Sequence, residues 1–374
     1  MKLIVIMPAL NEAATVGSVV GQVPRRLPGI DITEVIVVDD GSTDDTAIIA
    51  QRAGAKVISL GTNQGNGAAV IAGLKTALAD GADLLVTIDA DGQFDPRDVA
   101  KLVQPILDGK ADFVTCSRFA LADRVPQMPR VKLWGNSVVT ALTNFIAGTN
   151  VSDSSCGFRA YTRDTALKMN VYSEFDYAQE ALVALAAHGV KIDEMSLPVR
   201  GVREFGQSRI ARNLVLFSGK CLSTLLRTMR DFRPLLFFGG LGALFFSVGV
   251  FLGGWVIVHW MRTGETQPYT SFLTGSSVGL LMGIVLLVLA LVADSLSRTR
   301  RILEELLYFS KREYFESIKA GRKSGTMTQV DLPREQRERA PDRWNDGDTE
   351  HKRVSSAEVR GCFWIAIAGF CRWR

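Results

Sequence analysis

Two long apolar stretches constrain what this chain can fold into more than any other feature. Residues 235–260 and 272–293 contain no Asp, Glu, Lys or Arg. As helices rising about 1.5 Å per residue they would be roughly 39 and 33 Å long, enough to cross a hydrocarbon layer about 30 Å thick. Few soluble domains contain two such stretches in succession. We therefore predict two transmembrane helices within residues 233–295.

Positive charge is distributed unevenly around these stretches. Basic residues precede the first stretch and follow the second, whereas the connecting segment 261–271 holds only Arg262. Because basic flanks favour the cytoplasmic side, we expect both long ends of the chain to face the cytoplasm, as in a two-span protein of the cell membrane. The flanking basic residues are Arg212, Lys220, Arg227, Arg230, Arg233, Arg298, Arg300 and Arg301.

Three further segments adjoin the predicted spans. Residues 208–232 mix Leu, Val and Phe with Arg and Lys, which indicates either an ordinary surface helix or, as we favour beside a span, an interfacial helix. Residues 296–319 suggest an amphipathic helix that packs on the membrane or on another copy of the chain, so a homo-oligomer is one expectation. Residues 320–374 are predicted to form a largely disordered tail.

The overall composition excludes some classes of protein. A net charge of +4 gives no reason to expect a nucleic-acid partner. The five cysteines form no CxxC pair and have no metal-ligand spacing, which favours a reducing compartment over a disulfide scaffold.

The first 207 residues alternate short apolar runs with helical stretches, which predicts an α/β domain. Its expected fold is a doubly wound, mostly parallel, Rossmann-like sheet. Ligands of such sheets bind at the carboxyl ends of the strands, so the residues after each run are candidates for function. The predicted strands are 3–7, 34–39, 56–60, 84–89 and 112–116.

The residues after the fourth run, Asp89-Ala90-Asp91-Gly92-Gln93, suggest a metal site. Along an extended chain the two aspartates point to the same face, and their oxygens suit Mg²⁺ or Mn²⁺ that also holds phosphate. An EF-hand is excluded, because Phe94 and Ala100 stand where its glycine and glutamate would be. A simple helix cap would need only Asp95 and would leave the aspartate pair unexplained.

The second run is followed by another acidic segment, 39–46 (DDGSTDDT). Capping explains part of it, but the remaining acids favour hydrogen bonds to a ligand base or ribose. The usual phosphate-binding loops are not found. The sequence GTNQGNG at 61–67 lacks the full dinucleotide fingerprint, and no Walker A motif is present.

Several motifs together resemble the inverting family-2 glycosyltransferases, which have a GT-A fold. Three of them are Pro8…Asn11-Glu12, the segment 38–44 (VDDGSTD) and the segment 89–93 (DADGQ). Further motifs, at 117–119 (SRF), 156–159 (CGFR) and 203–209 (REFGQSR), narrow the likeness to the polyprenyl-phosphate branch. That branch contains dolichyl-phosphate mannose synthases and bacterial polyprenyl-phosphate glucosyltransferases. The resemblance covers about residues 1–232, and the two-span hairpin is similar to one subgroup.

The resemblance implies an activity and a set of site residues. The activity is transfer of a hexose, with inversion, from a UDP- or GDP-sugar to dolichyl or undecaprenyl phosphate, with Mg²⁺ or Mn²⁺ as cofactor. Ala9 replaces a frequent aromatic residue of the family, and Arg209 replaces a usual Lys. The implied residues are Pro8, Ala9, Asn11, Glu12, Asp40 and Asp89 for the nucleoside, Asp91 and Gln93 for the metal, Arg203 for the diphosphate, Arg118, Arg130 and Lys132 for the acceptor phosphate, and Ser208 and Arg209 as further phosphate candidates.

The chemistry of the acceptor suggests roles for two more residues. Asp153 is a candidate for orienting the acceptor or taking a residual proton, although a plain Asx turn explains its sequence equally well. Glu180 ranks below it, since it could simply lie on the polar face of a helix. The basic, proline-broken segment 124–136 is expected to form a loop over the site.

A nucleotide-sugar protein could have functions other than transfer to a polyprenyl phosphate. A processive polysaccharide synthase should carry Gln-x-x-Arg-Trp, but Ala340 and Gly369 stand three residues before the two Arg-Trp pairs. Transfer to a hydroxyl acceptor in polysaccharide or glycolipid synthesis remains an alternative. A non-catalytic nucleotide-sugar sensor or scaffold is another.

Overall fold

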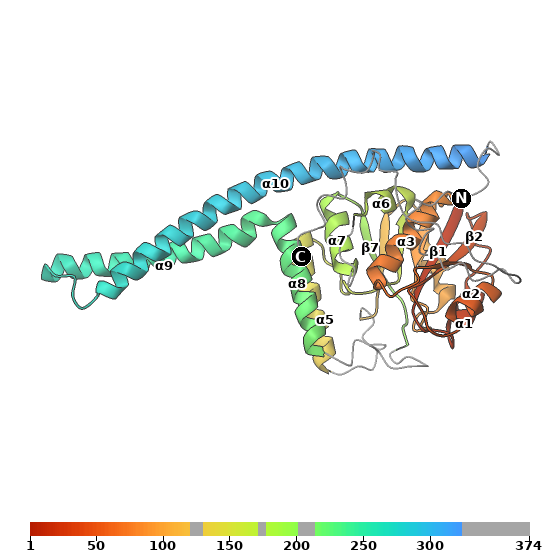
Figure 1. Cartoon of the computed structure of the whole chain (residues 1–374), viewed down its shortest axis with the longest axis horizontal. Coiled ribbons are helices and arrows are strands. Elements are labelled where there is room, and N and C mark those ends of the chain that lie inside the picture. The colour runs from red at the N-terminus through yellow and green to blue at the C-terminus, as the bar shows by residue number, and fades with distance from the viewer. Residues whose placement is uncertain (120–129, 171–176, 201–213, 324–374) are drawn as a thin grey trace, which may run out of the picture. The chain divides into compact units, whose positions relative to one another are not determined.

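The computed structural model describes residues 1–119, 130–170, 177–200 and 214–323, which all lie within one compact unit, Met1–Asp331. Seven strands form one sheet in the order β3-β2-β1-β4-β6-β5-β7 (Figure 1). β6 runs antiparallel to its neighbours β4 and β5, and all other neighbouring pairs are parallel. The strands are β1 (Lys2–Ala9), β2 (Ile32–Asp39), β3 (Lys56–Ser59), β4 (Leu84–Thr87), β5 (Phe113–Ser117), β6 (Arg159–Thr162) and β7 (Ile192–Ser196).

Helices cover both faces of this sheet (Figure 1). Two hydrophobic clusters lie between the sheet and its helices, one on each face. The helices of this part of the chain are α1 (Val16–Gln22), α2 (Thr46–Arg52), α3 (Asn66–Ala79), the short 3₁₀ helix η1 (Pro96–Asp98), α4 (Val99–Leu107), α5 (Arg130–Ala147), α6 (Arg163–Lys168), α7 (Tyr177–Ala187) and α8 (Leu214–Phe232).

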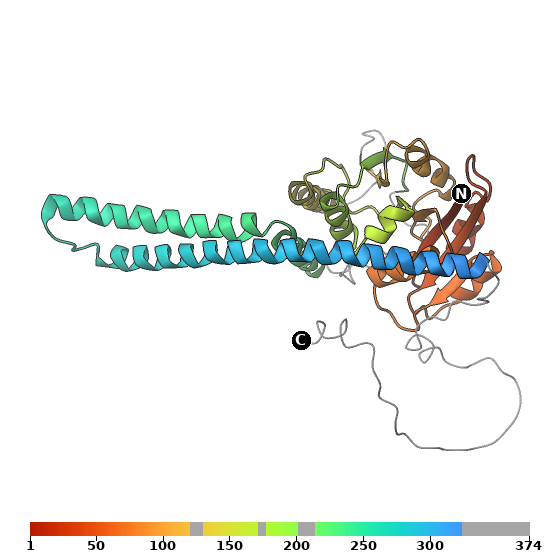
Figure 2. The same ribbon diagram turned by 90° about the horizontal axis from the view of Figure 1, so that it is seen from above.

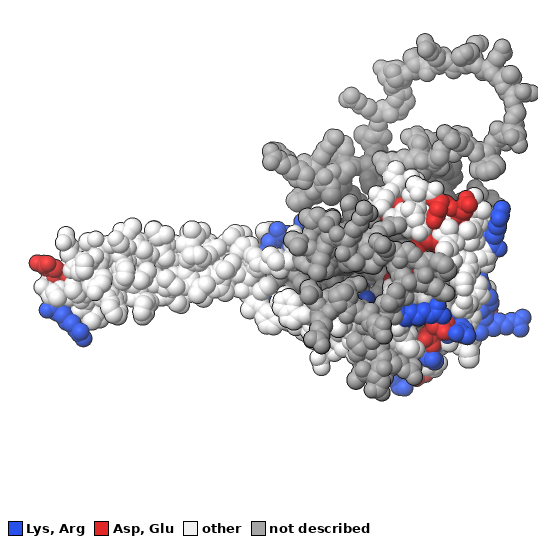
Figure 3. Space-filling model, turned by 90° about the horizontal axis from the view of Figure 1, so that it is seen from below, with Lys and Arg blue, Asp and Glu red and all other residues white. Residues whose placement is uncertain are grey.

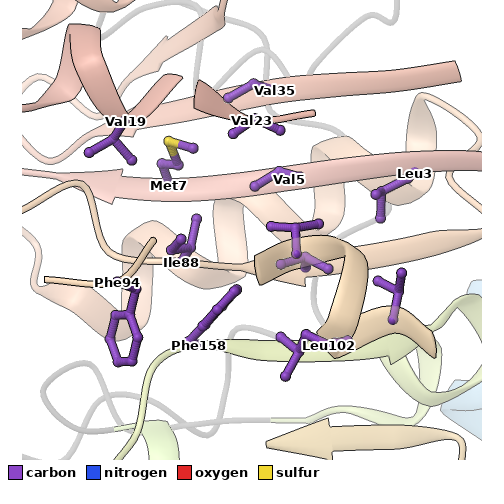
Figure 4. Close-up of a cluster of buried hydrophobic side chains, with 14 of the residues drawn as sticks. Leu3, Val5, Met7, Val19, Val23, Val35, Ile88, Phe94, Leu102 and Phe158 are labelled. Carbon is purple, nitrogen blue, oxygen red and sulfur yellow. The ribbon is translucent and has the colours of Figure 1, made fainter. Parts of the chain in front are cut away.

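Strand β1 shows why the apolar run at the N-terminus forms the centre of the sheet. Successive side chains of a strand point to opposite faces. Leu3, Val5 and Met7 belong to the cluster covered by α1 and α4, part of which is drawn in Figure 4. Ile4 and Ile6 belong to the other cluster, beneath α3. A strand buried on both faces needs a continuous apolar run, and the sequence provides it.

The predicted fold class is confirmed. The structure has a doubly wound, mostly parallel sheet followed by a hairpin of two long apolar helices. It adds β6 and β7, which the sequence patterns did not predict. It also corrects one local expectation, because residues 130–136 of the predicted loop form the first turns of α5.

Helices α9 (Pro234–Thr263) and α10 (Thr270–Lys323) are long and apolar enough to cross a membrane. They lie side by side in both ribbon views (Figures 1 and 2), and little of their apolar surface is buried. Glycines allow this close packing, since a Cβ on Gly249 would lie 2.7 Å from the backbone nitrogen of Leu280. Ser276 Oγ also donates to the carbonyl of Gly249 at 2.8 Å. On the face drawn in Figure 3, the apolar part of the pair shows no charged residue between its tip and the α/β domain.

α10 continues well beyond the apolar stretch and contacts the α/β domain. Phe315 and Ile318 join the cluster beneath α3, and Tyr308 bonds Asp164 of α6. Lys311 Nζ donates to Asn170 Oδ1 at 2.6 Å. The predicted second span, 272–293, and the predicted amphipathic helix, 296–319, are thus parts of one continuous helix.

Two glycines provide a matched test of how α3 packs on β1. A Cβ on Gly73 of α3 would lie 2.3 Å from Ile6 Cγ2, whereas one on Gly21 of α1 would have no neighbour within 4 Å. We expect Gly73→Ala to lower the free energy of unfolding by about 1–3 kcal/mol, the usual cost of overpacking a core. Gly21→Ala should raise it by about 0.5 kcal/mol, because alanine favours helix. Thermal unfolding of both variants in detergent measures the difference, and equal melting temperatures would contradict this packing.

Candidate active site

The loops that carry most of the predicted site residues meet at one edge of the sheet. The parallel strands β1, β2, β4 and β5 all end there. β6 is antiparallel, so the residues that precede it, 152–158, also lie at this edge. β7 is parallel to β5 and brings residues 197–200 to the same place.

Asn11 joins the loop after β1 to the loop after β2. Its φ of 54° places it in the left-handed region, which Asn tolerates better than most residues. Its backbone N–H donates to Ser42 Oγ at 2.9 Å, and its Oδ1 accepts the N–H of Thr43 at 2.8 Å. The N–H of Glu12 donates to Thr46 Oγ1 at 2.8 Å. The predicted nucleoside residues Asn11 and Glu12 are therefore held in fixed positions.

The two aspartates at the end of β2 bind the protein's own backbone. Asp40 is buried, and its two carboxylate oxygens accept the N–H groups of Gln64 at 2.7 Å and Gly65 at 2.9 Å. Asp39 Oδ1 accepts the N–H of Ser42 at 3.0 Å. Asp40, predicted to contact a nucleoside, thus has at least one structural role, which is to anchor the start of α3.

The acidic turn after β4 is fixed to α1. Thr15 Oγ1 donates to the carbonyl of Ala90 at 2.8 Å, and Gly92 has a φ of 72° that lets the chain turn. Asp91 is only 3% exposed, and its Oδ1 accepts the N–H of Gln93 at 3.0 Å. Asp91 and Gln93 are therefore neighbours in one tight turn.

Asp89 lies against the loop that precedes β6. A Cβ on Gly157 would approach the two Asp89 carboxylate oxygens to 3.2 and 3.1 Å, so a residue without a side chain fits best there. The carbonyl of Gly157 also accepts a hydrogen bond from Thr87 Oγ1 at 2.8 Å. Asp89 thus faces the same loop that carries Asp153.

Asp91 and Gln93 fit a magnesium or manganese ion that a substrate helps to hold. Among the described residues there is no cluster of three His, Cys, Asp or Glu side chains suited to a metal. Mg²⁺ commonly binds one or two carboxylates together with substrate phosphates, so a full protein cage is not required. Gln93 Nε2 donates to the carbonyl of Arg200 at 3.3 Å, so Oε1 is the side-chain atom that could bind a metal. A cleft of about 400 Å³ adjoins this turn, between it and α1.

Arg118 and Asp153 form a two-pronged ion pair at this edge. Arg118 Nε donates to Asp153 Oδ2 at 2.6 Å, and Nη2 donates to Oδ1 at 3.0 Å. Asp153 is 0% exposed and the Arg118 side chain 22% exposed. Burial alone would lower the pKa of Arg118, but hydrogen bonding and charge attraction from Asp153 outweigh it and raise that pKa above its usual value. The guanidinium is therefore permanently charged.

The remaining predicted residues differ in how far the structure describes them. Pro8 and Ala9 are the last residues of β1, and Glu180 is a buried residue of α7. Arg130 and Lys132 lie in the first turn of α5, and their side chains are outside the described part of the chain. Three more lie wholly outside the described residues: Arg203, Ser208 and Arg209.

Three further residues shape this site and were not predicted from the sequence. Thr15 holds the acidic turn, Gly157 makes room for Asp89, and Glu194 of β7 binds the loop that carries Asp153. A glycine or threonine beside a motif gives a faint signal at best. Glu194 stands in the polar strand sequence IDEMS, where a glutamate is expected to face solvent.

Comparison with known proteins gives a consistent set of matches. Residues 4–168 match the model of glycosyl transferase family 2. The chain is 34% identical over 215 residues to a UDP-N-acetylglucosamine–dolichyl-phosphate N-acetylglucosaminyltransferase of Methanococcus voltae, a match covering 51% of this chain and 83% of that protein. It is 33% identical over 198 residues to a dolichyl-phosphate hexose transferase of Haloferax volcanii, covering 53% and 82%. It is also 27% identical over 306 residues to a dodecaprenyl-phosphate galacturonate synthase of Rhizobium johnstonii, covering 77% and 83%.

The Arg118–Asp153 pair can be tested by a double-mutant cycle. Arg118→Met would leave the buried Asp153 carboxylate without its cation. We expect it to lower the free energy of unfolding by about 2–4 kcal/mol, somewhat less than for a fully buried pair because Arg118 is partly exposed. In an Asp153→Asn background, Arg118→Met should lower the free energy of unfolding by at least about 1 kcal/mol less than it does in the native protein. This difference is the coupling energy of the pair. Additive losses in thermal or denaturant unfolding would show that the two side chains do not interact.

Proposed function

Because this chain belongs to glycosyl transferase family 2, we propose that it transfers a hexose from a nucleotide-diphosphate sugar to a membrane polyprenyl phosphate. The product is a lipid-linked monophosphate sugar. The proposal rests on one observation. The acidic turn with Asp91 and Gln93 lies at the same sheet edge as Arg118, which Asp153 holds in place. The first suits the donor diphosphate, and the second suits an acceptor phosphate. The named relatives act on dolichyl or dodecaprenyl phosphate, which supports this acceptor class.

The donor would bind across the loops after β1, β2 and β4. Pro8, Asn11 and Glu12 would lie along the nucleoside, with Asp40 fixing the neighbouring loop. Asp91 and Gln93 would hold Mg²⁺ or Mn²⁺, which when bound supplies positive charge to the diphosphate. Arg203 is proposed as a second positive partner of the diphosphate.

The acceptor would bind beside Arg118. Nε and Nη2 of its guanidinium bond Asp153, so Nη1 is the nitrogen positioned for an acceptor oxygen. The second pKa of a phosphate monoester is about 6, so at neutral pH the attacking oxygen is already largely ionised. A strong general base is then unnecessary, and the pairing with Arg118 favours an orienting role for Asp153. Arg130 and Lys132 are proposed as further contacts to this phosphate.

The reaction itself is a displacement at the anomeric carbon of the sugar. An oxygen of the lipid phosphate forms the new bond to that carbon as the bond to the donor diphosphate breaks, and the nucleoside diphosphate leaves with the electron pair. Attack from the opposite side inverts the configuration. The protein's main task is to bring two anions together, which preorganised positive charge can accomplish.

A membrane surface is the natural place for such an acceptor. Beyond α9 and α10, helix α5 carries an exposed apolar stripe that includes Trp134, 70% exposed, and Phe145, 59% exposed. α8 lies beside α5, and the two pack through Leu225 and Ile146 while Leu222 of α8 remains exposed. Exposed apolar stripes of this kind suit an interfacial position against lipid headgroups. We propose that the catalytic domain lies on the cytoplasmic side of the cell membrane.

The donor side can be tested with Asp91→Ala. Purified full-length protein is incubated with UDP- and GDP-hexoses, polyprenyl phosphate and Mg²⁺ or Mn²⁺, and the lipid product is identified by mass. We expect chelator to abolish transfer, added metal to restore it, and Asp91→Ala to reduce it at least about a hundredfold, by analogy with the loss of other charge-stabilising groups. Asp108→Asn is the matched control, since Asp108 follows α4 at the opposite edge of the sheet and pairs with Lys110 on the surface, and it should stay within about threefold of the native rate.

One outcome would refute this assignment. If folded Asp91→Ala transfers sugar at the native rate in the presence of chelator, the acidic turn does not serve a metal.

The proposed topology makes a labelling prediction. A cysteine replacing Glu265, in the connection between α9 and α10, should react with a membrane-impermeant maleimide in intact cells. A cysteine replacing exposed Lys110 of the α/β domain should react only after the membrane is permeabilised. Both variants are made in a background without native cysteines. The reverse pattern would place the catalytic domain on the opposite side.

A further inference from the structure

Glu194 lies in the middle of β7, the edge strand of the sheet, and pairs in register with Thr115 of β5. Its side chain is half-buried and turned toward the loop that precedes β6. Four hydrogen-bond contacts of 2.8–3.0 Å reach its carboxylate, all from Ser152 and Asp153. This is an unusually full set of donors for a glutamate on an edge strand.

The donors come from two successive backbone N–H groups and one hydroxyl. The N–H of Ser152 lies 2.8 Å from Oε1 and 2.9 Å from Oε2 of Glu194, and Ser152 Oγ lies 2.8 Å from Oε2. The N–H of Asp153 donates to Oε1 at 3.0 Å. Ser152 Oγ also contacts Ser117 Oγ, at the end of β5. The carboxylate therefore fixes the backbone at the residue whose side chain binds Arg118.

The rest of the loop is fixed by other elements. Asn144 of α5 bonds both backbone groups of Val151, and Thr140 of α5 accepts the N–H of Ser154 at 3.3 Å. Between these two points, the backbone N–H groups of Ser152 and Asp153 face Glu194. Hydrogen bonds to a charged partner are roughly twice as strong as neutral ones, so Glu194 holds these two N–H groups firmly, as the Arg159 guanidinium holds the carbonyl of Ser154 at 2.9 Å.

We propose that Glu194 is a positioning residue for the transfer reaction. It holds the Ser152–Asp153 backbone so that the Asp153 carboxylate keeps the Arg118 guanidinium aimed at the acceptor phosphate. Glu194 does not touch either substrate and acts through Asp153. This inference rests on the proposed function, because it assigns Arg118 to the acceptor, and it adds a third member to the Arg118–Asp153 pair.

Replacing the carboxylate with an amide tests the role with little change of shape. Glu194→Gln keeps one acceptor oxygen but presents an NH₂ group to backbone N–H donors. We expect kcat/KM for polyprenyl phosphate to fall about ten- to a hundredfold, the range typical of residues that orient a site group. The KM for the sugar nucleotide should stay within about twofold, because the donor residues belong to β1, β2 and β4. A general loss of structure would instead impair the kinetic constants for the donor and for the acceptor to the same extent.

Asp193→Asn is the matched control. It makes the same carboxylate-to-amide change one residue away, on an exposed side chain. Within the described part of the chain Asp193 accepts the N–H of Glu194, which an amide oxygen can also accept. This variant should behave like the native protein. Glu194→Asp, which keeps the charge on a shorter side chain, should recover part of the activity lost in Glu194→Gln.

The route through Asp153 is tested by combination. In an Asp153→Asn background, Glu194→Gln should reduce kcat/KM for the acceptor by less than about threefold, because the group it positions is already altered. Thermal melting of each variant, with and without nucleotide, verifies that the donor site is folded. A native acceptor rate in Glu194→Gln, an equal loss for donor and acceptor, or a full additional loss in the double variant would each overturn the proposal.

The same experiment separates this inference from the proposed function. If the native protein glycosylates a hydroxyl acceptor and not a polyprenyl phosphate, the proposed function is wrong. Glu194→Gln is then compared with the native protein on that acceptor. A fall in kcat/KM for the acceptor with an unchanged KM for the sugar nucleotide would still support the role of Glu194. If the native protein does use polyprenyl phosphate but Glu194→Gln is unimpaired, the inference alone fails.

Discussion

The antiparallel strand β6 is the constraint on which the arrangement of the site depends. It lies between β4 and β5 and runs opposite to both, so the loop before it returns to the edge where those two strands end. Asp89 follows β4, Arg118 follows β5, and the loop from Asp153 to Gly157 passes between them. A parallel strand in this place would have sent that loop to the far edge of the sheet. Gly157 therefore lies against Asp89, and Asp153 reaches Arg118, because of this one reversal.

Buried charge near the site divides into groups that hold the fold and groups available for chemistry. Asp39 and Asp40 accept backbone N–H groups and so secure the loop after β2 and the start of α3. Burying a carboxylate is costly unless it is paired or hydrogen-bonded, and these bonds offset that cost. Asp91 lies in the turn with Gln93, whose amide oxygen points away from the bond to Arg200. These three aspartates look alike in sequence but differ in the partners that their loops provide.

Sequence patterns predicted the first five strands and the helix pair and singled out the acidic turn as a candidate site, because each depends on a local apolar run or a short motif. They did not predict β6, whose first residue is the fully buried Arg159. Its Nη1 donates to the carbonyl of Ala178 and its Nη2 to that of Ser154, both at 2.9 Å. A buried arginine interrupts the apolar pattern of a strand, and bonds to backbone carbonyls 5 and 19 residues away leave no periodic signal. Glu194 likewise bonds backbone N–H groups 41 and 42 residues away. The sequence could single out Asp91 as a candidate metal ligand, but it could not predict that Glu194 holds the backbone of Asp153.

Helix α10 gives the domain a mechanical connection to the apolar helix pair that flexible linkers could not provide. It is continuous from the apolar stretch to its contact with α6, without a break between Ala290 and Lys311. At that contact Lys311 is largely buried, and burial lowers its pKa to about 8. The hydrogen bond from Lys311 Nζ to Asn170, beside the end of α6, offsets part of the cost of burying this cation. Together with the packing of Phe315 and Ile318 beneath α3, this bond joins the apolar helix pair to the α/β domain through one unbroken helix.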